Sequence, residues 1–320
     1  MMDWVDKNVL ITGVNGFIGS ALARFLEDAG ANVVGLSHRT DRRGYNIDLV
    51  EFADVRDVNA MRRIIATNEI EHVFHLAASS IVRSSARDPF GTYDVNVMGT
   101  VSVLEACRQV GESVRSIVIA SSDKAYGGNA LPYIESTPLL ASNTYDVSKA
   151  CADMIARSYA SNYDMPVVVT RASNVYGPGD PNASRLIPNT VIRLLRGERP
   201  ILYSDTARMV REFIHIDDVV SAYELISKHT MDIDLRGHAV NIGGNGPVNV
   251  QDVVEMIRDV MKLSDDKSTL PIIVERESSF REIREQCIDA GRLERMGWKR
   301  SVSLRDGLTS VVRFYESGAR

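Results

Sequence analysis

The chain has 320 residues, of which 44% are apolar and 25% charged. This composition allows a substantial buried core and argues against a disordered or fibrous protein. The 37 basic and 42 acidic residues give a formal net charge of −5 with no long basic run, so general attraction to nucleic acid is not expected.

The cysteines and the amino terminus bear on the cellular compartment. Cys107, Cys151 and Cys287 are too few and too scattered for a disulfide framework or a paired metal motif. The first residues carry charge where a secretory signal would be apolar, and no run approaches the roughly 18 apolar residues of a membrane span. We expect a cytoplasmic protein with reduced thiols, no catalytic metal and no membrane partner.

Short apolar runs alternate with helical patterns over the first half of the chain. The predicted buried strands are Asn8–Thr12, Asn32–Leu36, His72–Leu76, Ser116–Ser121 and Pro166–Thr170. Apolar residues at three- and four-residue spacing predict the helices Phe17–Ala29, Asn96–Arg108 and Ser148–Tyr163. This alternation predicts an α/β fold with a Rossmann-type, doubly wound parallel sheet.

The rhythm weakens from about residue 172, where Gly177–Pro181 and Gly243–Pro247 predict loops. We expect residues 1–171 to form a dinucleotide-binding domain and residues 172–320 to form mainly a smaller substrate-binding region. The two should be partly interleaved, because no flexible linker separates them.

Three glycines mark the predicted dinucleotide site. Gly13, Gly16 and Gly19 follow the first strand and open a helix beginning at Phe17. In this context glycines let a pyrophosphate approach the main chain at the amino terminus of a helix.

The second strand ends without the carboxylate that would bind a ribose 2′-hydroxyl. It continues instead as Ser37-His38-Arg39, and basic side chains there favour a 2′-phosphate and hence NADP over NAD, with a solvated basic loop as the alternative. Farther on, Asp54 and Val55 can hold the adenine edge. Asp54 can equally be a loop carboxylate or a helix cap.

Tyr145 and Lys149 lie four residues apart at the start of a predicted helix, so they share a face. A nearby ammonium lowers the pKa of a phenol and makes the phenolate available as a base. The strand before them delivers Ser122, Asp123 and Lys124 at its carboxyl end, where open α/β sheets bind ligands. An exposed Asp123–Lys124 ion pair is the alternative.

Two further polar residues have a structural alternative. His75 is predicted to be a packed histidine rather than a catalyst or metal ligand. Asn96 is predicted to bridge main chain near the site, to cap the helix that follows it, or to do both.

These motifs together resemble the extended short-chain dehydrogenase/reductase family over nearly the whole chain. The segments that carry the resemblance are Thr12–Gly19, His75–Ala78, Asn96, Ser122, Tyr145-x-x-x-Lys149 and Arg171–Gly177. Within the family, Ser122–Gly127 and Asn174 through Arg185–Pro188 look most like nucleotide-sugar 4,6-dehydratases, particularly the CDP-glucose type. Sugar 4-epimerases are the close alternative.

The resemblance implies roles for individual residues. Ser122 and Tyr145 would contact the sugar 4-hydroxyl, Lys149 the nicotinamide ribose, and Asp123 and Lys124 would serve as acid and base in water loss. The implied cofactor contacts are Gly13, Asn15, Gly16, Phe17, Ile18, Gly19, His38, Arg39, Asp54, Val55, Leu76, Ala77, Ala78, Asn96, Tyr145 and Lys149. The implied substrate contacts are Ser122, Asn174, Arg185, Arg211 and Arg281.

The predicted function is therefore that of a nucleotide-diphospho-sugar 4,6-dehydratase that uses bound NAD(P). A 4-epimerase would need only Ser122, Tyr145 and Lys149, and a non-catalytic redox sensor would need none of the three. The resemblance also implies a homodimer, built on the surplus apolar faces of the helices Asn96–Arg108 and Ser148–Tyr163.

Overall fold

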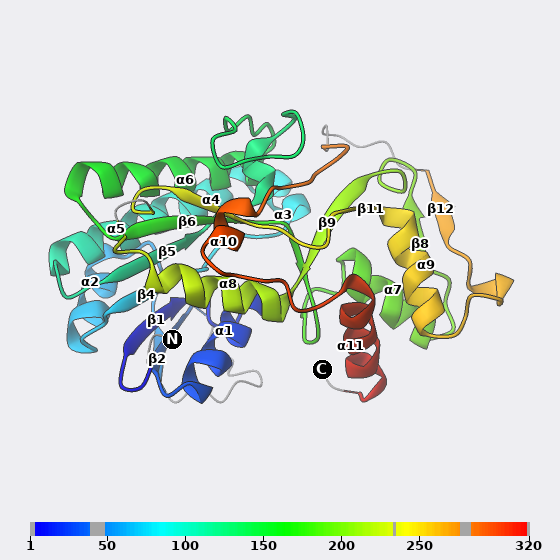
Figure 1. The fold of residues 1–320 in the computed structure, drawn as a ribbon, viewed down its shortest axis with the longest axis horizontal. Helices are drawn as coiled ribbons and strands as arrows, with labels where there is room; N and C mark the ends of the chain where they lie inside the picture. The colour runs from blue at the N-terminus through cyan, green and yellow to red at the C-terminus, as the bar shows by residue number, and fades with distance from the viewer. Residues whose placement is uncertain (1–3, 39–48, 233–234, 276–282, 319–320) are drawn as a thin grey trace.

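A parallel sheet forms the centre of the fold in the computed structural model, which describes residues 4–38, 49–232, 235–275 and 283–318 (Figure 1). Its strands are β1 (Asn8–Thr12), β2 (Asn32–Ser37), β3 (Leu49–Phe52), β4 (His72–His75), β5 (Ser116–Ala120), β6 (Val167–Ala172) and β10 (Ala239–Ile242). They lie in the order β10-β6-β5-β4-β1-β2-β3, and every neighbouring pair is parallel. The predicted doubly wound α/β sheet is confirmed.

The sequence patterns predict five of these strands to within two residues and miss β3 and β10. β3 is a short, partly exposed edge strand beside β2, so it lacks the apolar run of a central strand. β10 is buried throughout but contains Asn241. The side chain of Asn241 accepts from the Tyr126 hydroxyl at 2.6 Å and donates to the main-chain oxygens of Tyr133 and Asp289 at 3.0 Å. These partners lie far away in sequence, so periodicity cannot reveal them.

Helices cover both faces of the sheet (Figure 1). One face carries α2 (Val58–Thr67), α5 (Gly99–Val110) and α6 (Thr144–Tyr163), and the other carries α1 (Phe17–Asp28) and α8 (Ile216–Lys228). Each helix layer forms its own apolar core with the strands, one around Leu10 and Ile117 and the other around Val9 and Phe74. Burial on both faces explains the continuous apolar runs of the central strands.

The second half of the chain adds two small sheets beside the large one, on the right in Figure 1. β7 (Asn174–Tyr176) pairs in parallel with β9 (Val210–His215), which pairs with the antiparallel β11 (Pro247–Asn249). β8 (Ile201–Tyr203) pairs with β12 (Ile272–Val274). A third apolar core joins α7 (Leu186–Leu195), α9 (Val250–Val260) and α11 (Leu304–Glu316).

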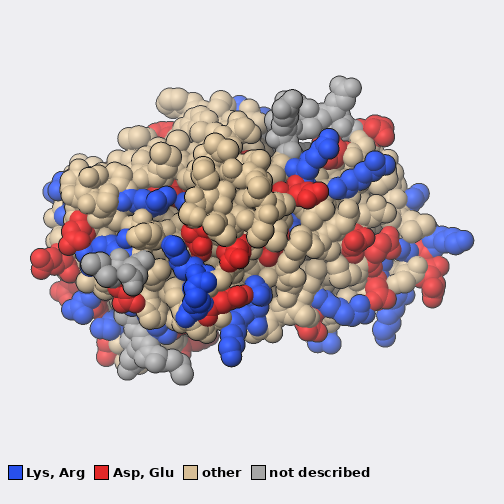
Figure 2. All heavy atoms as spheres, turned by 45° about the horizontal axis from the view of Figure 1, so that its top comes forward, with Lys and Arg blue, Asp and Glu red and all other residues tan. Residues whose placement is uncertain are grey.

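The remaining elements are short. They are α3 (Val82–Arg87), α4 (Pro89–Tyr93), the π-helix η1 (Asp94–Met98), the 3₁₀ turns η2 (Asp123–Tyr126) and η3 (Lys267–Thr269), and α10 (Gly291–Arg295). None of the helices in the described part of the chain is long and apolar enough to cross a bilayer. Figure 2 shows basic and acidic side chains interspersed over the face that it draws.

The domain boundary at residue 171 stays a prediction. β10 and α8 both follow that residue in the chain, yet both belong to the large sheet and its cover. Any division into a dinucleotide-binding and a substrate-binding unit must therefore be an interleaved one.

A buried ion pair ties the sheet to the two elements that carry the predicted catalytic residues. The fully buried Arg171 of β6 donates to both carboxylate oxygens of Asp153 in α6, at 2.7 and 3.0 Å. It also donates to the hydroxyl of Tyr126, the last residue of η2, at 2.9 Å. β6, α6 and η2 are thus held in one arrangement.

Asp153→Asn tests this pair, because it removes the counter-charge of Arg171 and keeps the side-chain volume. We expect the free energy of unfolding, measured with urea, to fall by about 3–5 kcal/mol, since the guanidinium would stay buried and uncompensated. Arg157→Ala is the matched control. Arg157 is exposed and lies 3.9 Å from the same carboxylate, so its loss should cost under about 1 kcal/mol. Equal losses would contradict the assignment.

Candidate active site

The turn between β1 and α1 is closed to side chains. Gly13 has a φ of +71°, and a Cβ there would lie 2.8 Å from the Cα of Ala77. A Cβ on Gly19 would collide with the main-chain oxygen of Gly13. α1 begins without a side-chain cap, so the first N–H groups of the helix, including those of Phe17 and Ile18, point toward the turn. This turn fits a pyrophosphate held by main-chain donors.

The segment after β4 lies against the same turn. Thr12 Oγ1 accepts from the main-chain N–H groups of Leu76 and Ala77, each at 3.1 Å, so its own proton goes to His75 Nδ1 at 2.8 Å. The other ring nitrogen donates to Thr100 at 3.1 Å. Burial lowers the pKa of His75 to about 3, so the ring is neutral. His75 is therefore a packed histidine, as the sequence predicts, and its two ring nitrogens are paired with threonine hydroxyls. Ala78 continues the same segment.

The predicted cofactor-selecting residues lie at the end of β2. The side chain of Asn15 donates to Ser37 at 2.8 Å, and His38 is exposed. The predicted Arg39 lies outside the described residues. The described part of this strand end therefore carries a hydroxyl and an imidazole at the position of the usual carboxylate.

Asp54 forms an ion pair with Arg56. Its carboxylate accepts from the main-chain N and the Nε of Arg56, both at 2.9 Å, and Arg56 also pairs with Asp94 of η1. The hydrogen bonds from Arg56, with a smaller contribution from the charge of His38, lower the pKa of Asp54 to about 2. Asp54 is thus an ionised, exposed carboxylate close to His38, next to the buried Val55.

Asn96 is buried inside η1 and joins three elements. It accepts from the main-chain N of Ser79 at 2.7 Å and donates to the oxygen of Ser79 at 3.1 Å and to Ser148 of α6 at 2.8 Å. The predicted bridging role agrees with these contacts. The alternative of a helix cap is wrong, because the chain is helical on both sides of Asn96. A π-helical turn at such a position often marks a functional site.

The turn after β5 presents the predicted acid. Ser122 Oγ donates to Asp123 Oδ1 at 3.0 Å and accepts from the main-chain N of Lys124 at 3.3 Å. Asp123 is only 2% exposed, which excludes the alternative of an exposed ion pair. Burial raises its pKa, against the opposing charges of Lys124 and Arg211, which favours the protonated form of Asp123.

Tyr145 and Lys149 lie on one face of α6. Asn143 caps this helix and accepts from the N–H of Asp146 at 3.0 Å. Burial raises the pKa of the Tyr145 phenol, which also hydrogen-bonds with Ser122. Lys149 donates to the main-chain oxygen of Ala120 at 2.7 Å, and burial lowers its pKa to about 8. Ser122, Asp123, Tyr145 and Lys149 are therefore brought together.

The predicted substrate contacts come from the second half of the chain. Asn174 opens β7 and donates to the main-chain oxygen of Glu212 at 3.0 Å. Arg185 precedes α7, pairs with Asp180 at 2.9 Å, and lies close enough to Tyr145 to lower its pKa.

Arg211 of β9 approaches the turn Ser122–Lys124, which is called the acid turn below. Its side chain is buried and donates to the main-chain oxygen of Arg284 at 3.1 Å. Its charge acts on Asp123. The predicted Arg281 lies outside the described residues.

Two buried residues beside Asp123 escape the sequence analysis. Gln286 donates from Nε2 to Asp123 Oδ2 at 3.1 Å. Glu212 accepts from the main-chain N of Ile288 at 2.9 Å, and burial raises its pKa, as does the charge of Asp123. Neither residue has a local pattern, although Glu212 directly follows the predicted Arg211.

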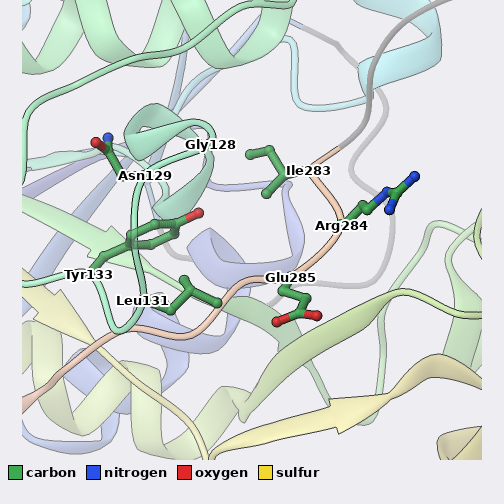
Figure 3. Close-up of a pocket in the computed structure, with 7 residues that line it drawn as sticks. All are labelled: Gly128, Asn129, Leu131, Tyr133, Ile283, Arg284 and Glu285. Atoms are coloured by element: carbon green, nitrogen blue, oxygen red, sulfur yellow. The ribbon is translucent and has the colours of Figure 1, made fainter.

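A cavity of about 400 Å³ opens beside this turn. Figure 3 shows that the loop carrying Leu131 and Tyr133 faces the segment 283–285, with the guanidinium of Arg284 directed away from Tyr133. Burial, with a smaller contribution from the charge of Asp123, raises the pKa of Tyr133 to about 12. Tyr133, which lines the cavity, therefore lies close enough to Asp123 to sense its charge.

The fold and the site define the class of protein. A glycine turn that fits a dinucleotide and a Ser122, Tyr145 and Lys149 group at the carboxyl end of β5 are features of the short-chain dehydrogenase/reductase type, which binds a nicotinamide dinucleotide. The chain belongs to the GDP-mannose 4,6 dehydratase family, which matches residues 10–311. The predicted resemblance is confirmed.

Curated relatives are dehydratases and epimerases of nucleotide sugars. The CDP-glucose 4,6-dehydratase of Salmonella typhimurium is 30% identical, over 99% of this chain and 92% of its own length. The chain spans about half the length of the first curated relatives that it matches. One of these, a trifunctional UDP-glucose 4,6-dehydratase of Arabidopsis thaliana, is 28% identical over 98% of this chain and 48% of its own length.

Solved structures of both kinds of enzyme share the fold. DesIV, a dTDP-glucose 4,6-dehydratase from Streptomyces venezuelae with NAD bound, is 29% identical with a TM-score of 0.84 over 97% of each chain. The UDP-glucose 4-epimerase of Thermotoga maritima is 26% identical with a TM-score of 0.86 over 98% of this chain and 100% of its own.

Lys149 should lose its proton near pH 8 in the protein without cofactor, because burial disfavours the ammonium. NMR titration of ¹³C-labelled lysine, assigned with Lys149→Met, measures the midpoint. A midpoint near 10.5, the usual pKa of a lysine, would contradict this expectation. The folded pKa lies below the unfolded one, so the unfolded chain binds more protons between the two values. The stability of the wild type relative to Lys149→Met should therefore rise with pH across that window.

Proposed function

We propose that this protein is a nucleotide-diphospho-sugar 4,6-dehydratase. The buried Asp123, with its pKa raised by burial and its carboxylate beside Ser122 and Tyr145, carries the proposal. Ser122, Tyr145 and Lys149 suffice for oxidation and reduction at sugar carbon 4. A carboxylic acid in the same group has a use when the hydroxyl on carbon 6 must leave as water.

The first step is oxidation of carbon 4. When bound, the nicotinamide would supply the acceptor for the hydride of carbon 4 and the source of the hydride for carbon 6. Tyr145 removes the proton of the 4-hydroxyl, which Ser122 holds by a hydrogen bond. Lys149, if it remains protonated in the complex, lowers the pKa of the phenol, which burial otherwise raises.

Water is then lost across carbons 5 and 6. The 4-ketone acidifies the hydrogen on carbon 5, Lys124 removes it, and Asp123 protonates the oxygen that leaves carbon 6. Lysine is a base only when neutral, so a substrate that covers the half-buried Lys124 must displace water from it. We assign the nucleotide diphosphate to Arg211, Arg185 and Arg281, and a sugar contact to Asn174.

We propose NADP as the favoured cofactor. Ser37 and His38 occupy the strand end where a carboxylate would repel a 2′-phosphate, and Arg39 follows in the sequence. Asp54 and Val55 would face the adenine, and Asn96 would support the nicotinamide side through Ser79 and Ser148.

We also propose a homodimer. Phe90 of α4, Met98 of η1 and Met154 of α6 are 81, 49 and 61% exposed, which is unusual for large apolar side chains on one helical layer. The cytoplasmic location expected from the unpaired cysteines stays a proposal. Native mass spectrometry of the purified protein tests the homodimer and the preference for NADP, because it measures the mass of the assembly and of any retained dinucleotide. A monomeric mass would contradict the homodimer. A complex with NAD, when NAD and NADP are offered equally, would contradict the cofactor preference.

A 4-epimerase is the second candidate, favoured by the close structural likeness to the Thermotoga maritima enzyme. That reaction interconverts the two configurations at carbon 4 and leaves the hydroxyl on carbon 6 in place. A redox sensor without catalysis would have little use for a buried acid and Lys149 beside the phenol.

The deciding experiment is mass spectrometry of the protein incubated with CDP-, UDP-, dTDP- and GDP-hexoses and catalytic amounts of cofactor. A dehydratase gives a keto product lighter by one water, and an epimerase gives an isomer of unchanged mass. Asp123→Asn should still reduce the bound cofactor, seen by absorbance, while slowing water loss at least about 100-fold. Tyr145→Phe should lose both steps. Equal loss of both steps in Asp123→Asn would overturn the assignment of the acid.

A further inference from the structure

Gln286 is a fully buried amide whose NH₂ group faces the acid turn. Its main chain is already satisfied, because its N–H donates to the oxygen of Val210 at 3.1 Å. Its side-chain Nε2 donates to Asp123 Oδ2 at 3.1 Å, while Oε1 has no hydrogen-bond partner among the described residues. Buried polar atoms are rarely left unpaired in folded proteins.

Several charged or titratable groups surround Asp123. Lys124 adjoins it in η2, Arg211 and Glu212 approach from β9, Tyr145 from α6, and Tyr133 from the following loop. In addition Ser122 donates to Oδ1. The direct partner of Oδ2 is therefore the neutral amide of Gln286, which changes neither the net charge nor the proton count of the site.

An amide can bond either protonation state of a carboxyl group. Its NH₂ donates to a carboxylate, and after a half-turn about the last side-chain bond its oxygen accepts from a carboxylic acid. In the arrangement observed here the NH₂ faces Asp123, and the unpaired oxygen is the acceptor that the protonated form needs. Either orientation of the amide keeps a hydrogen bond to Oδ2, through the NH₂ group to the carboxylate or through the amide oxygen to the carboxylic acid.

We propose that Gln286 is the positioning residue for Asp123, holding its carboxyl group in one orientation both before and after it gives up its proton. The inference rests on the proposed dehydratase function. In that reaction the Asp123 proton goes to the oxygen on carbon 6, the carbon–oxygen bond breaks, and water leaves with that proton. Lys124 takes the proton from carbon 5 and would give it back to carbon 5 when carbon 6 regains a hydride. Asp123 becomes a carboxylate that accepts from Gln286. It regains a proton from solvent, to which Tyr145 releases the proton of the 4-hydroxyl.

The test replaces Gln286 with methionine, which keeps the length and removes both hydrogen-bonding groups. We expect water loss to slow about 10- to 100-fold, with carbon 4 oxidation within about 3-fold of the wild type. A bond to an ionised group is stronger than one to a neutral group. The rate of water loss falls at high pH, where Asp123 loses its proton. The midpoint of this high-pH limb of the pH–rate profile should therefore move up by about one pH unit. Gln251→Met, on an exposed side chain of α9, is the matched control and should change neither quantity.

A spectroscopic readout needs no substrate. Infrared difference spectra of wild type minus Asp123→Asn isolate the carbonyl stretch of the Asp123 carboxylic acid. In the Gln286→Met background this band should move to higher frequency and persist to higher pH, because the carboxyl group loses its partner. A purely packing role for Gln286 would lower thermal stability and leave the band and the pH limb where they are.

Gln286→Glu covers the case in which the methionine variant does not fold. It keeps the volume and the hydrogen bond, and the two carboxyl groups would share a proton. We expect its high-pH limb to lie above that of the wild type and its rate of water loss to exceed that of Gln286→Met. Unchanged pH limbs in the folded variants would overturn the inference. Failure of the wild type to dehydrate any nucleotide hexose would instead overturn the proposed function, which separates the two results.

Discussion

The parallel, in-register pairing of four central strands is the constraint on which the candidate site depends. β1 pairs with β4, β4 with β5, and β5 with β6, so Thr12, His75, Ile119 and Val169 form one row across the sheet. The residues that follow this row all emerge at the same edge. The glycine turn, the segment after β4 and the acid turn after β5 therefore meet there, although they lie more than 100 positions apart in the chain at the extremes.

Desolvation shifts the pKa values of the ionisable groups at this edge of the sheet. The same packing that builds two apolar cores withdraws water from Lys149, Tyr145 and Asp123, and it shifts each toward its neutral form. A lysine with its pKa lowered to about 8 and a carboxylic acid with a raised pKa are useful in proton transfer and unfavourable for stability. The buried Arg171–Asp153 pair meets the same problem in a different way, because it keeps both charges and satisfies each with the other.

The candidate site also needs the second half of the chain. Arg211 and Glu212 of β9 and the segment through Gln286 close over the acid turn, and the cavity beside Tyr133 lies between these parts (Figure 3). The large sheet and its helices carry the glycine turn together with Ser122, Tyr145 and Lys149. The later segments contribute Gln286, which donates to Asp123, and Arg211, whose charge acts on Asp123.

The sequence by itself determined the central strands, the glycine turn and the shared face of Tyr145 and Lys149, because each is a local pattern set by the period of a strand or a helix. Only the tertiary structure decided that Asp123 is buried and that Gln286, 163 positions away, is its partner. The tertiary structure also decided the position of β10 in the sheet and the choice between the two predicted roles of Asn96. Burial and long-range hydrogen bonds depend on what lies opposite in space, and no periodicity along one segment contains that information.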